Sequence, residues 1–152
     1  MKRILLILSI FIGMACSREV VEKKIDVETQ HVIILKNKAG QNLLDTNTPN
    51  HFSIDDFLVY KLDLNGNKVI VQNNKVDFSS EWGYFIYLVD FGIDEFTVNN
   101  QPIVYLQLSK STIDTIKLEY EMVNGNTYSK KLWYNGELKW TKENDKPIEI
   151  IK

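Results

Sequence analysis

The sequence predicts an all-β protein, an antiparallel β-sandwich of the immunoglobulin-like or a related type with about eight or nine short strands. Apolar and polar side chains alternate in short runs along most of the chain, and the clearest run covers residues 115–122. A period of two places every second side chain on the same face of a strand. Asn65-Gly66, Asn124-Gly125 and Asn135-Gly136 separate such runs. These dipeptides supply the positive φ angles that tight hairpins need.

The expected strands follow one another in chain order and end at turn residues. The run 31–35 is rich in β-branched side chains and closes at the turn 37–40. The run 103–108 follows Pro102, which stands where a strand begins and where its missing N–H costs little. Residues 53–57 form one helical turn at most. The expected strands are 31–35, 57–64, 68–72, 76–78, 82–91, 103–108, 115–122, 127–134 and 137–140, with 148–151 as a candidate last strand. This pattern leaves the strand order open.

The first fifteen residues have the order of a secretory signal. Lys2 and Arg3 precede an apolar run, and Gly13-Met14-Ala15 leads into Cys16. The apolar run, residues 4–15, would span roughly 18 Å as a helix, whereas the hydrocarbon core of a bilayer is about 30 Å thick. The sequence therefore predicts a signal peptide over residues 1–15 and not a transmembrane helix.

The position of Cys16 resembles the cleavage site of a bacterial lipoprotein precursor. Ala15 is the small residue expected before the Cys, while Gly13 replaces the usual Leu, a relaxed pattern common in lipoproteins of the Bacteroidetes. This resemblance implies that Cys16 carries acyl chains such as palmitate. The charged residues 16–30 are expected to form a tether, or else to begin the first strand at Ile25 and Val27, and residues 31–152 to form one sandwich domain. Ser17 in place of Asp favours the outer membrane, with the side of the membrane left open. The alternative is ordinary signal cleavage with Cys16 as a free thiol.

Later segments resemble small Bacteroidetes lipoproteins whose all-β domain has no known function. The similar residues are 38–45 with the Thr48-Pro49 loop, 113–120 and 133–138. The resemblance implies a fold and a location in the cell envelope, and it carries no activity.

The sequence offers few groups for catalysis or metal binding. Only His31 and His51 are of the residue type suited to acid–base catalysis near neutral pH, no Gly-x-Ser-x-Gly motif occurs, and Cys16 is the only cysteine. The segment 63–74 lacks the Gly and the Glu of a calcium-binding EF-hand. We therefore expect a protein that is not an enzyme, without cofactor or metal. A cation held by loop carboxylates remains open, from Asp45, Asn47, Asp55 and Asp56 or from Asp90, Asp94 and Glu95.

Aromatic side chains are the strongest candidates for ligand contact. Trp82, Trp133 and Trp140 are candidates for stacking against a ring-shaped ligand, although large aromatics more often lie in the core of a sandwich. A two-residue Asn135-Gly136 turn places Trp133, Leu138 and Trp140 on one face of the last hairpin. We expect a two-residue Asn124-Gly125 turn, which directs that face to the core. A three-residue turn, 124–126, would direct the same face outward.

The expected function is that of a membrane-anchored binding or structural module of the cell envelope. Its partners are the membrane, through the lipid anchor, and a protein or a glycan of the envelope. The net charge of −2, with both signs dispersed along the chain, argues against nucleic acid. The alternative function is that of a carbohydrate-binding accessory lipoprotein in a glycan-uptake system.

Overall fold

The computed structural model describes residues 27–28, 30–89, 102–144 and 146–152. The predicted signal peptide, Cys16 and most of the tether lie outside these ranges, as do Asp90, Asp94 and Glu95. The described strands are β1 (Val27–Glu28), β2 (His31–Lys36), β3 (Leu58–Leu62), β4 (Lys68–Ile70), β5 (Lys75–Ser79), β6 (Gly83–Leu88), β7 (Ile103–Gln107), β8 (Ile113–Val123), β9 (Asn126–Tyr134), β10 (Glu137–Thr141) and β11 (Ile148–Ile151). A single 3₁₀ turn, η1 (Ile54–Asp56), is the helical element within these ranges.

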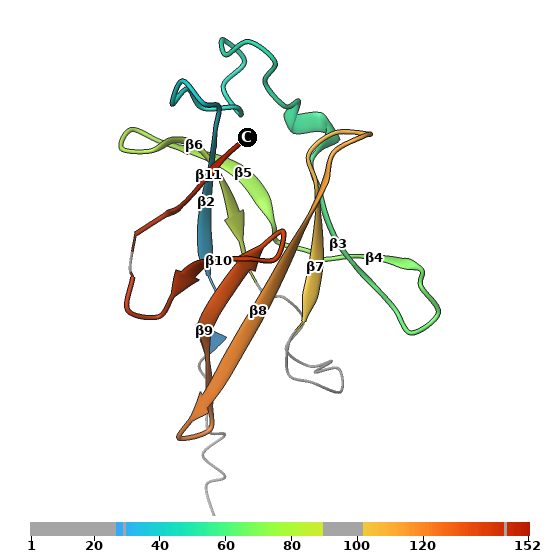
Figure 1. Ribbon diagram of the computed structural model, residues 1–152. Helices are drawn as coiled ribbons and strands as arrows, with labels where there is room; N and C mark the ends of the chain where they lie inside the picture. Colours follow the sequence, from blue (N-terminus) through green and yellow to red (C-terminus); the bar gives the residue numbers. More distant parts are fainter. Residues whose placement is uncertain (1–26, 29, 90–101, 145) are drawn as a thin grey trace, which may run out of the picture.

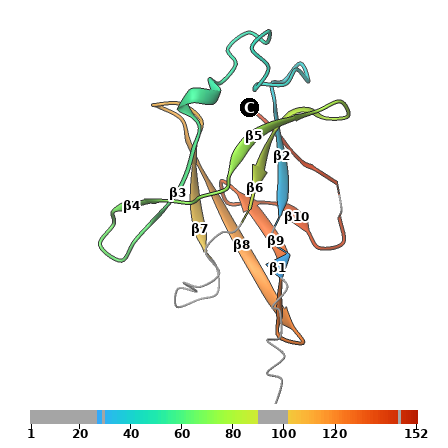
Figure 2. The same ribbon diagram turned by 180° about the vertical axis from the view of Figure 1, so that it is seen from behind.

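The strands form two sheets, which confirms the predicted all-β sandwich (Figures 1 and 2). The seven-stranded sheet has the order β1-β9-β8-β7-β3-β4, and β10 also pairs with β9. The four-stranded sheet has the order β11-β2-β6-β5. Two pairings, β1 with β9 and β11 with β2, are parallel, unlike the expected antiparallel arrangement. Hairpin turns produce antiparallel neighbours, and these two pairings join strands far apart in the chain.

The facing sides of the two sheets form one hydrophobic core. Ile33, Leu35 and Ile86 contribute from the four-stranded sheet, and Leu118 and Leu132 from the seven-stranded sheet, and all five are fully buried. Because side chains alternate between the two faces of a strand, the core receives alternate residues of β7, β8 and β9, namely Val104, Leu106, Ile116, Leu118, Leu132 and Tyr134. Burying each such side chain contributes about 1.5–3 kcal/mol, so these alternating runs are the main source of stability.

A β-bulge reverses the predicted orientation of Trp133. The Asn124-Gly125 loop has the expected two residues, with φ angles of 54° and 82°. Lys130, however, is an extra residue in β9. Leu118 therefore lies opposite Leu132, so the buried face of β8 continues onto the face of β9 that carries Leu132 and not onto the face that carries Trp133. The prediction that the face of Trp133 and Leu138 forms the core is therefore wrong. Leu138 is 50% exposed, whereas Leu132 is buried.

A second bulge returns Trp140 to the inner face. In β10, Leu138 pairs with Trp133, but Trp140 pairs with Leu132 because Lys139 is an extra residue between them. Trp140 therefore packs against the core from the inner side of the seven-stranded sheet. The three side chains expected on one face are thus divided between two faces.

The edge of β9 is covered by two different strands. β1 pairs with residues 127–128 of β9, and β10 pairs with residues 131–134. Ser129 and the bulged Lys130 lie between these two partners. Beside this position the chain passes from β1 to β2 and from β10 to β11, each time from one sheet to the other. The two crossings leave a hollow at the side of the sandwich.

Candidate ligand pocket

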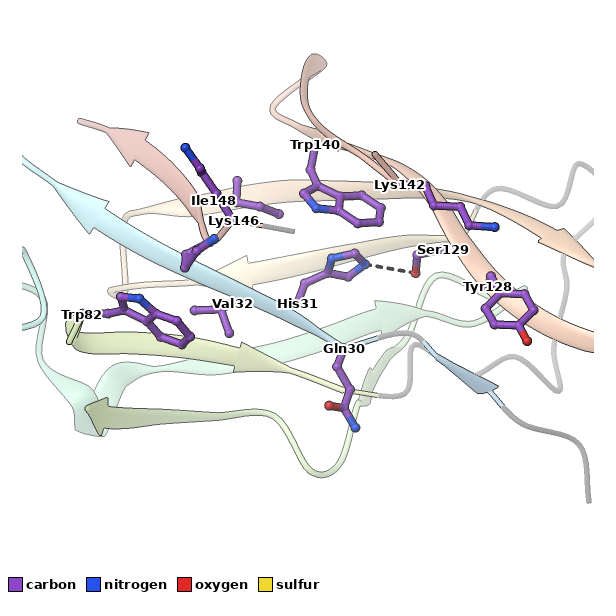
Figure 3. Close-up of a pocket in the computed structure, with 11 residues that line it drawn as sticks. Gln30, His31, Val32, Trp82, Tyr128, Ser129, Trp140, Lys142, Lys146 and Ile148 are labelled. Atoms are coloured by element: carbon purple, nitrogen blue, oxygen red, sulfur yellow. Dashed lines mark hydrogen bonds between the residues drawn. The ribbon is translucent and has the colours of Figure 1, made fainter. Parts of the chain in front are cut away.

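A cavity of about 420 Å³ lies beside Ser129, at the side of the sandwich (Figure 3). Its volume is within the range of small-molecule binding sites. The two crossings contribute part of its lining, Gln30 after β1 and Lys142, Lys146 and Pro147 before β11, and Ile148 begins β11. Trp82, from the turn before β6, lies at one end of the pocket in Figure 3, and Tyr128 of β9 lies at the other. The lining residues are Gln30, His31, Val32, Trp82, Tyr128, Ser129, Trp140, Lys142, Lys146, Pro147 and Ile148.

His31 and Trp140 form the middle of the pocket wall. The His31 ring meets the Trp140 ring edge-on, with centroids 4.7 Å apart and planes inclined by 77°. His31 Nε2 lies 3.0 Å from the hydroxyl of Ser129, a hydrogen bond that joins the two sheets. Burial lowers the pKa of His31 from 6.5 to about 4, so the imidazole is neutral at neutral pH. The wall that a ligand would meet here is therefore polar but uncharged.

The His31 imidazole and the Ser129 hydroxyl could in principle act as base and nucleophile, but neither side chain is accessible to a substrate. Both residues are only 5% exposed. A nucleophile must reach a substrate carbonyl and needs donors for the oxyanion that develops. We therefore interpret the contact between His31 and Ser129 as a structural hydrogen bond between the two sheets.

Charged and polar side chains surround the pocket, with Lys142 beside Tyr128 at one end (Figure 3). Lys142 Nζ lies 5.1 Å from the centroid of the Tyr128 ring and donates a hydrogen bond to Glu121. This hydrogen bond raises the pKa of Lys142, so its ammonium stays charged. Gln30 accepts a hydrogen bond of 2.6 Å from the hydroxyl of Tyr87 through Oε1. Lys146 is exposed at the rim, and no ion pair of its side chain is found among the described residues.

The structure brings two of the three predicted stacking tryptophans into this pocket and separates the third. Trp82 packs edge-on against Phe85, with ring centroids 5.8 Å apart, and Trp140 packs against His31. Trp133 lies on the outer face of the seven-stranded sheet. The ammonium groups of Lys117 and Lys131 lie 5.1 and 5.9 Å from its ring centroid.

The remaining candidates from the sequence have local structural roles. His51 lies in the loop before η1, where Nδ1 is 3.1 Å from the carbonyl oxygen of Thr48. The Asp45 carboxylate accepts hydrogen bonds from the backbone and side chain of Asn47. Asp63 accepts them from the turn residues Asn65 and Asn67. Within the described ranges, no three His, Cys, Asp or Glu residues gather in a way that would hold a metal ion.

The sequence did not predict a buried carboxylate at the start of β8. Asp114, which is 4% exposed, accepts hydrogen bonds from Tyr134 Oη at 2.6 Å and Asn135 Nδ2 at 2.7 Å. The ammonium of Lys152 also donates to it. Burial alone would raise the pKa of Asp114, but the hydrogen bonds from Asn135, Lys152 and Tyr134 outweigh it and hold the pKa below its usual value. This cluster links the end of the four-stranded sheet to the seven-stranded sheet, and it lies outside the pocket.

Comparisons of this chain with protein-family models, with curated proteins and with solved structures found no match. Over the described residues, no helix has the length and apolar character needed to cross a bilayer.

Proposed function

We propose that this chain is a lipid-anchored, non-enzymatic binding protein of the bacterial cell envelope that holds a saccharide in the pocket. The observation that carries the ligand class is that Trp82, Trp140 and Tyr128 line one cavity together with hydrogen-bonding side chains. A sugar ring offers an apolar C–H face that stacks on an aromatic ring, and hydroxyl groups that need donors and acceptors. Gln30 and Lys146 are polar side chains at exposed positions of the lining.

The sequence supports the anchor and the location. The segment Gly13-Met14-Ala15 followed by Cys16 is the basis for acylation at Cys16, and Ser17 favours the outer membrane. One acyl chain binds a bilayer marginally, and two or more hold a protein there stably, at about 0.8 kcal/mol per buried CH₂ group. The pocket would then belong to a domain held at the membrane surface, where it meets glycans of the envelope.

The burial of the His31–Ser129 pair supports a binding role and not a hydrolytic one. If the pair were catalytic, its exposure would have to rise well above 5% for a substrate to reach it. A hydrolytic activity lost in Ser129→Ala would contradict this part of the proposal.

The pocket is tested by titrating the purified protein with oligosaccharides while its tryptophan fluorescence is recorded. Trp82→Ala is expected to weaken binding by about tenfold, because stacking and burial of one aromatic ring contribute at least about 1.4 kcal/mol. Trp133→Ala is the matched control, since this tryptophan lies on the outer face and not in the pocket. Equal losses in the two variants, or no response to any plant, host or bacterial glycan, would refute the saccharide ligand.

The anchor is tested by growing cells with a clickable fatty acid and measuring its incorporation. The full chain is expected to carry the label and to fractionate with the outer membrane. Cys16→Ala is expected to lose both properties. A Cys16→Ala chain that still carries the label would refute acylation at this residue.

A second candidate function is contact with an envelope protein through the outer face of the seven-stranded sheet. Ile103, Lys117, Trp133 and Leu138 lie side by side across four strands there. Ile103 is 47% exposed and Leu138 is 50% exposed. Photo-crosslinking in cells from position 138 would identify such a partner, and Trp133→Ala is expected to reduce that crosslink while leaving saccharide binding unchanged.

A further inference from the structure

The hairpin of β8 and β9 forms a finger that extends beyond its neighbour. The last described pair between β7 and β8 is Ile103 with Lys117, while β8 continues to Val123. Leu118 is still buried and Tyr120 still packs against the core, so residues 121–123, about 10 Å of strand at about 3.4 Å per residue, form the end of the finger. Figures 1 and 2 show this finger pointing away from the end of the sandwich that holds the C-terminus.

The tip of the finger carries no charge, and two exposed apolar side chains precede its polar Asn124-Gly125 turn. Met122 is 73% exposed and Val123 is 42% exposed. No residue from 122 to 128 carries a charge, and Glu121, just before them, is paired with Lys142. The hairpin that joins β3 to β4 differs, since Asp63 and residue 68, a lysine, flank its exposed tip. Tyr128, opposite Glu121 near the tip, is of a residue type enriched where membranes meet water.

The chain enters the domain at this same finger. β1 runs parallel to β9, and its first residue, Val27, lies beside Thr127, next to the start of β9. Both strands run away from the hairpin turn, and the turn lies two to three residues before Thr127, about 7–10 Å away. Cys16 precedes Val27 by eleven residues, which span at most about 40 Å when fully extended. An acyl group on Cys16 would hold this end of the sandwich close to the bilayer.

We propose that the β8–β9 tip, Met122 with Val123, inserts into the interfacial layer of the phospholipid bilayer that holds Cys16. This inference rests on the proposed lipid anchor and specifies how the anchored domain is oriented. The tether alone would let the domain tumble, whereas a second apolar contact beside the tether fixes one end toward the membrane. Burial of the two exposed apolar side chains favours insertion, and residues 124–128 carry no charge. The polar Asn124-Gly125 turn would stay among the hydrated headgroups, where its amide groups keep hydrogen-bonding partners.

The test uses the full acylated chain with Met122→Cys, labelled with a fluorophore that reports the polarity of its surroundings. Cys16 is the only cysteine and is blocked when acylated, so the label attaches to residue 122. The protein is reconstituted into vesicles of phosphatidylethanolamine and phosphatidylglycerol. The emission is expected to shift to shorter wavelength and to be quenched by lipids brominated near the headgroup. Leu64→Cys is the matched control, because residue 64 is 99% exposed at a hairpin tip remote from β1, and its label is expected to stay in water.

Each outcome has a distinct meaning. Fatty-acid labelling of Cys16 with a water-like probe at residue 122 would overturn the inserted tip and leave the proposed anchor intact. Absence of fatty-acid labelling, with the fluorophore attaching to Cys16, would overturn both. Equal shifts at residues 122 and 64 would indicate a general approach of the domain to the bilayer and would also overturn insertion of this tip.

Discussion

The neutral buried histidine makes the stability of this protein depend on pH in a window where few other groups titrate. Burial beside Trp140 lowers the pKa of His31 to about 4, while the unfolded chain binds the same proton near pH 6.5. Between these values the unfolded chain binds more protons than the folded chain, so the free energy of unfolding falls as the pH falls. The full stability from this residue is present above about pH 6.5 and is lost as the pH decreases toward about pH 4.

The magnitude follows from the shift of the pKa. A shift of about 2.5 units at 1.36 kcal/mol per unit gives a total loss of about 3 kcal/mol, of which about 2 kcal/mol falls between pH 6.5 and pH 5. A small domain is stable by about 5–15 kcal/mol in total, so this loss is large enough to measure. Carboxylates titrate mostly below about pH 4.5, and the upper part of the window therefore isolates the histidine.

The assay is urea unfolding, followed by tryptophan fluorescence at about pH 7 and about pH 5. The wild-type chain is expected to lose about 2 kcal/mol between them. His31→Gln, which does not titrate, is expected to be less stable at neutral pH but to lose little on acidification. His51→Gln, at an exposed loop position, is the matched control and is expected to keep the wild-type dependence. If the His31→Gln chain loses as much stability as the wild type, His31 is not held neutral and the reasoning fails.

Three further predictions concern the core, the buried carboxylate and a turn. Leu118→Ala is expected to lower the free energy of unfolding, measured in urea, by about 3 kcal/mol, because Leu118 is fully buried. Leu138→Ala, at a half-exposed position, should lower it by less than about 1 kcal/mol, and equal losses in the two variants would contradict the assignment of faces. Asp114→Asn is expected to cost about 2 kcal/mol at neutral pH by weakening the hydrogen bonds from Tyr134 and its neighbours. The folded pKa of this carboxylate lies below the unfolded one, so its contribution is present above about pH 4 and disappears at lower pH, and an unchanged acid limb in the variant would refute it. Gly136→Ala is expected to lower the free energy of unfolding, measured by thermal denaturation, by about 1 kcal/mol, because the φ of +84° is unfavourable for alanine. An added Cβ would meet no atom within 4 Å, so backbone conformation is the only cause expected, and an unchanged free energy would contradict this.

The positions of the hairpins could be predicted from the sequence, and their registers could not. Asn124-Gly125 and Asn135-Gly136 adopt the positive φ angles that their side chains permit, so the turns follow from local chemistry. The bulges at Lys130 and Lys139 have no comparable local signature, because lysine fits an ordinary strand position equally well. One extra residue exchanges the two faces of a strand, and this is why the orientation of Trp133 was predicted wrongly.

The pocket depends on contacts between distant parts of the chain. Trp82 and Trp140 were both candidates because of their residue type, but only the order of the strands places them in one cavity. His31 and Ser129 are 98 residues apart, and their contact requires the correct bulge in β9. Asp114 becomes a buried acceptor only when Lys152 and Tyr134 arrive from other strands. The spacing of residues along the sequence does not indicate which of these distant side chains will be in contact.

The parallel pairing of β11 with β2 has a consequence for when the protein folds. β11 covers residues 148–151 and pairs with a strand that begins at residue 31, so more than a hundred residues must emerge before this edge of the four-stranded sheet can close. Lys152, which donates to Asp114, arrives later still. Closing so long a loop costs entropy that only the final contacts repay, and folding rates fall as such distant contacts increase. A partly synthesised chain therefore lacks the strand that completes its smaller sheet, and this edge of β2 has no β11 partner until residues 148–151 are available.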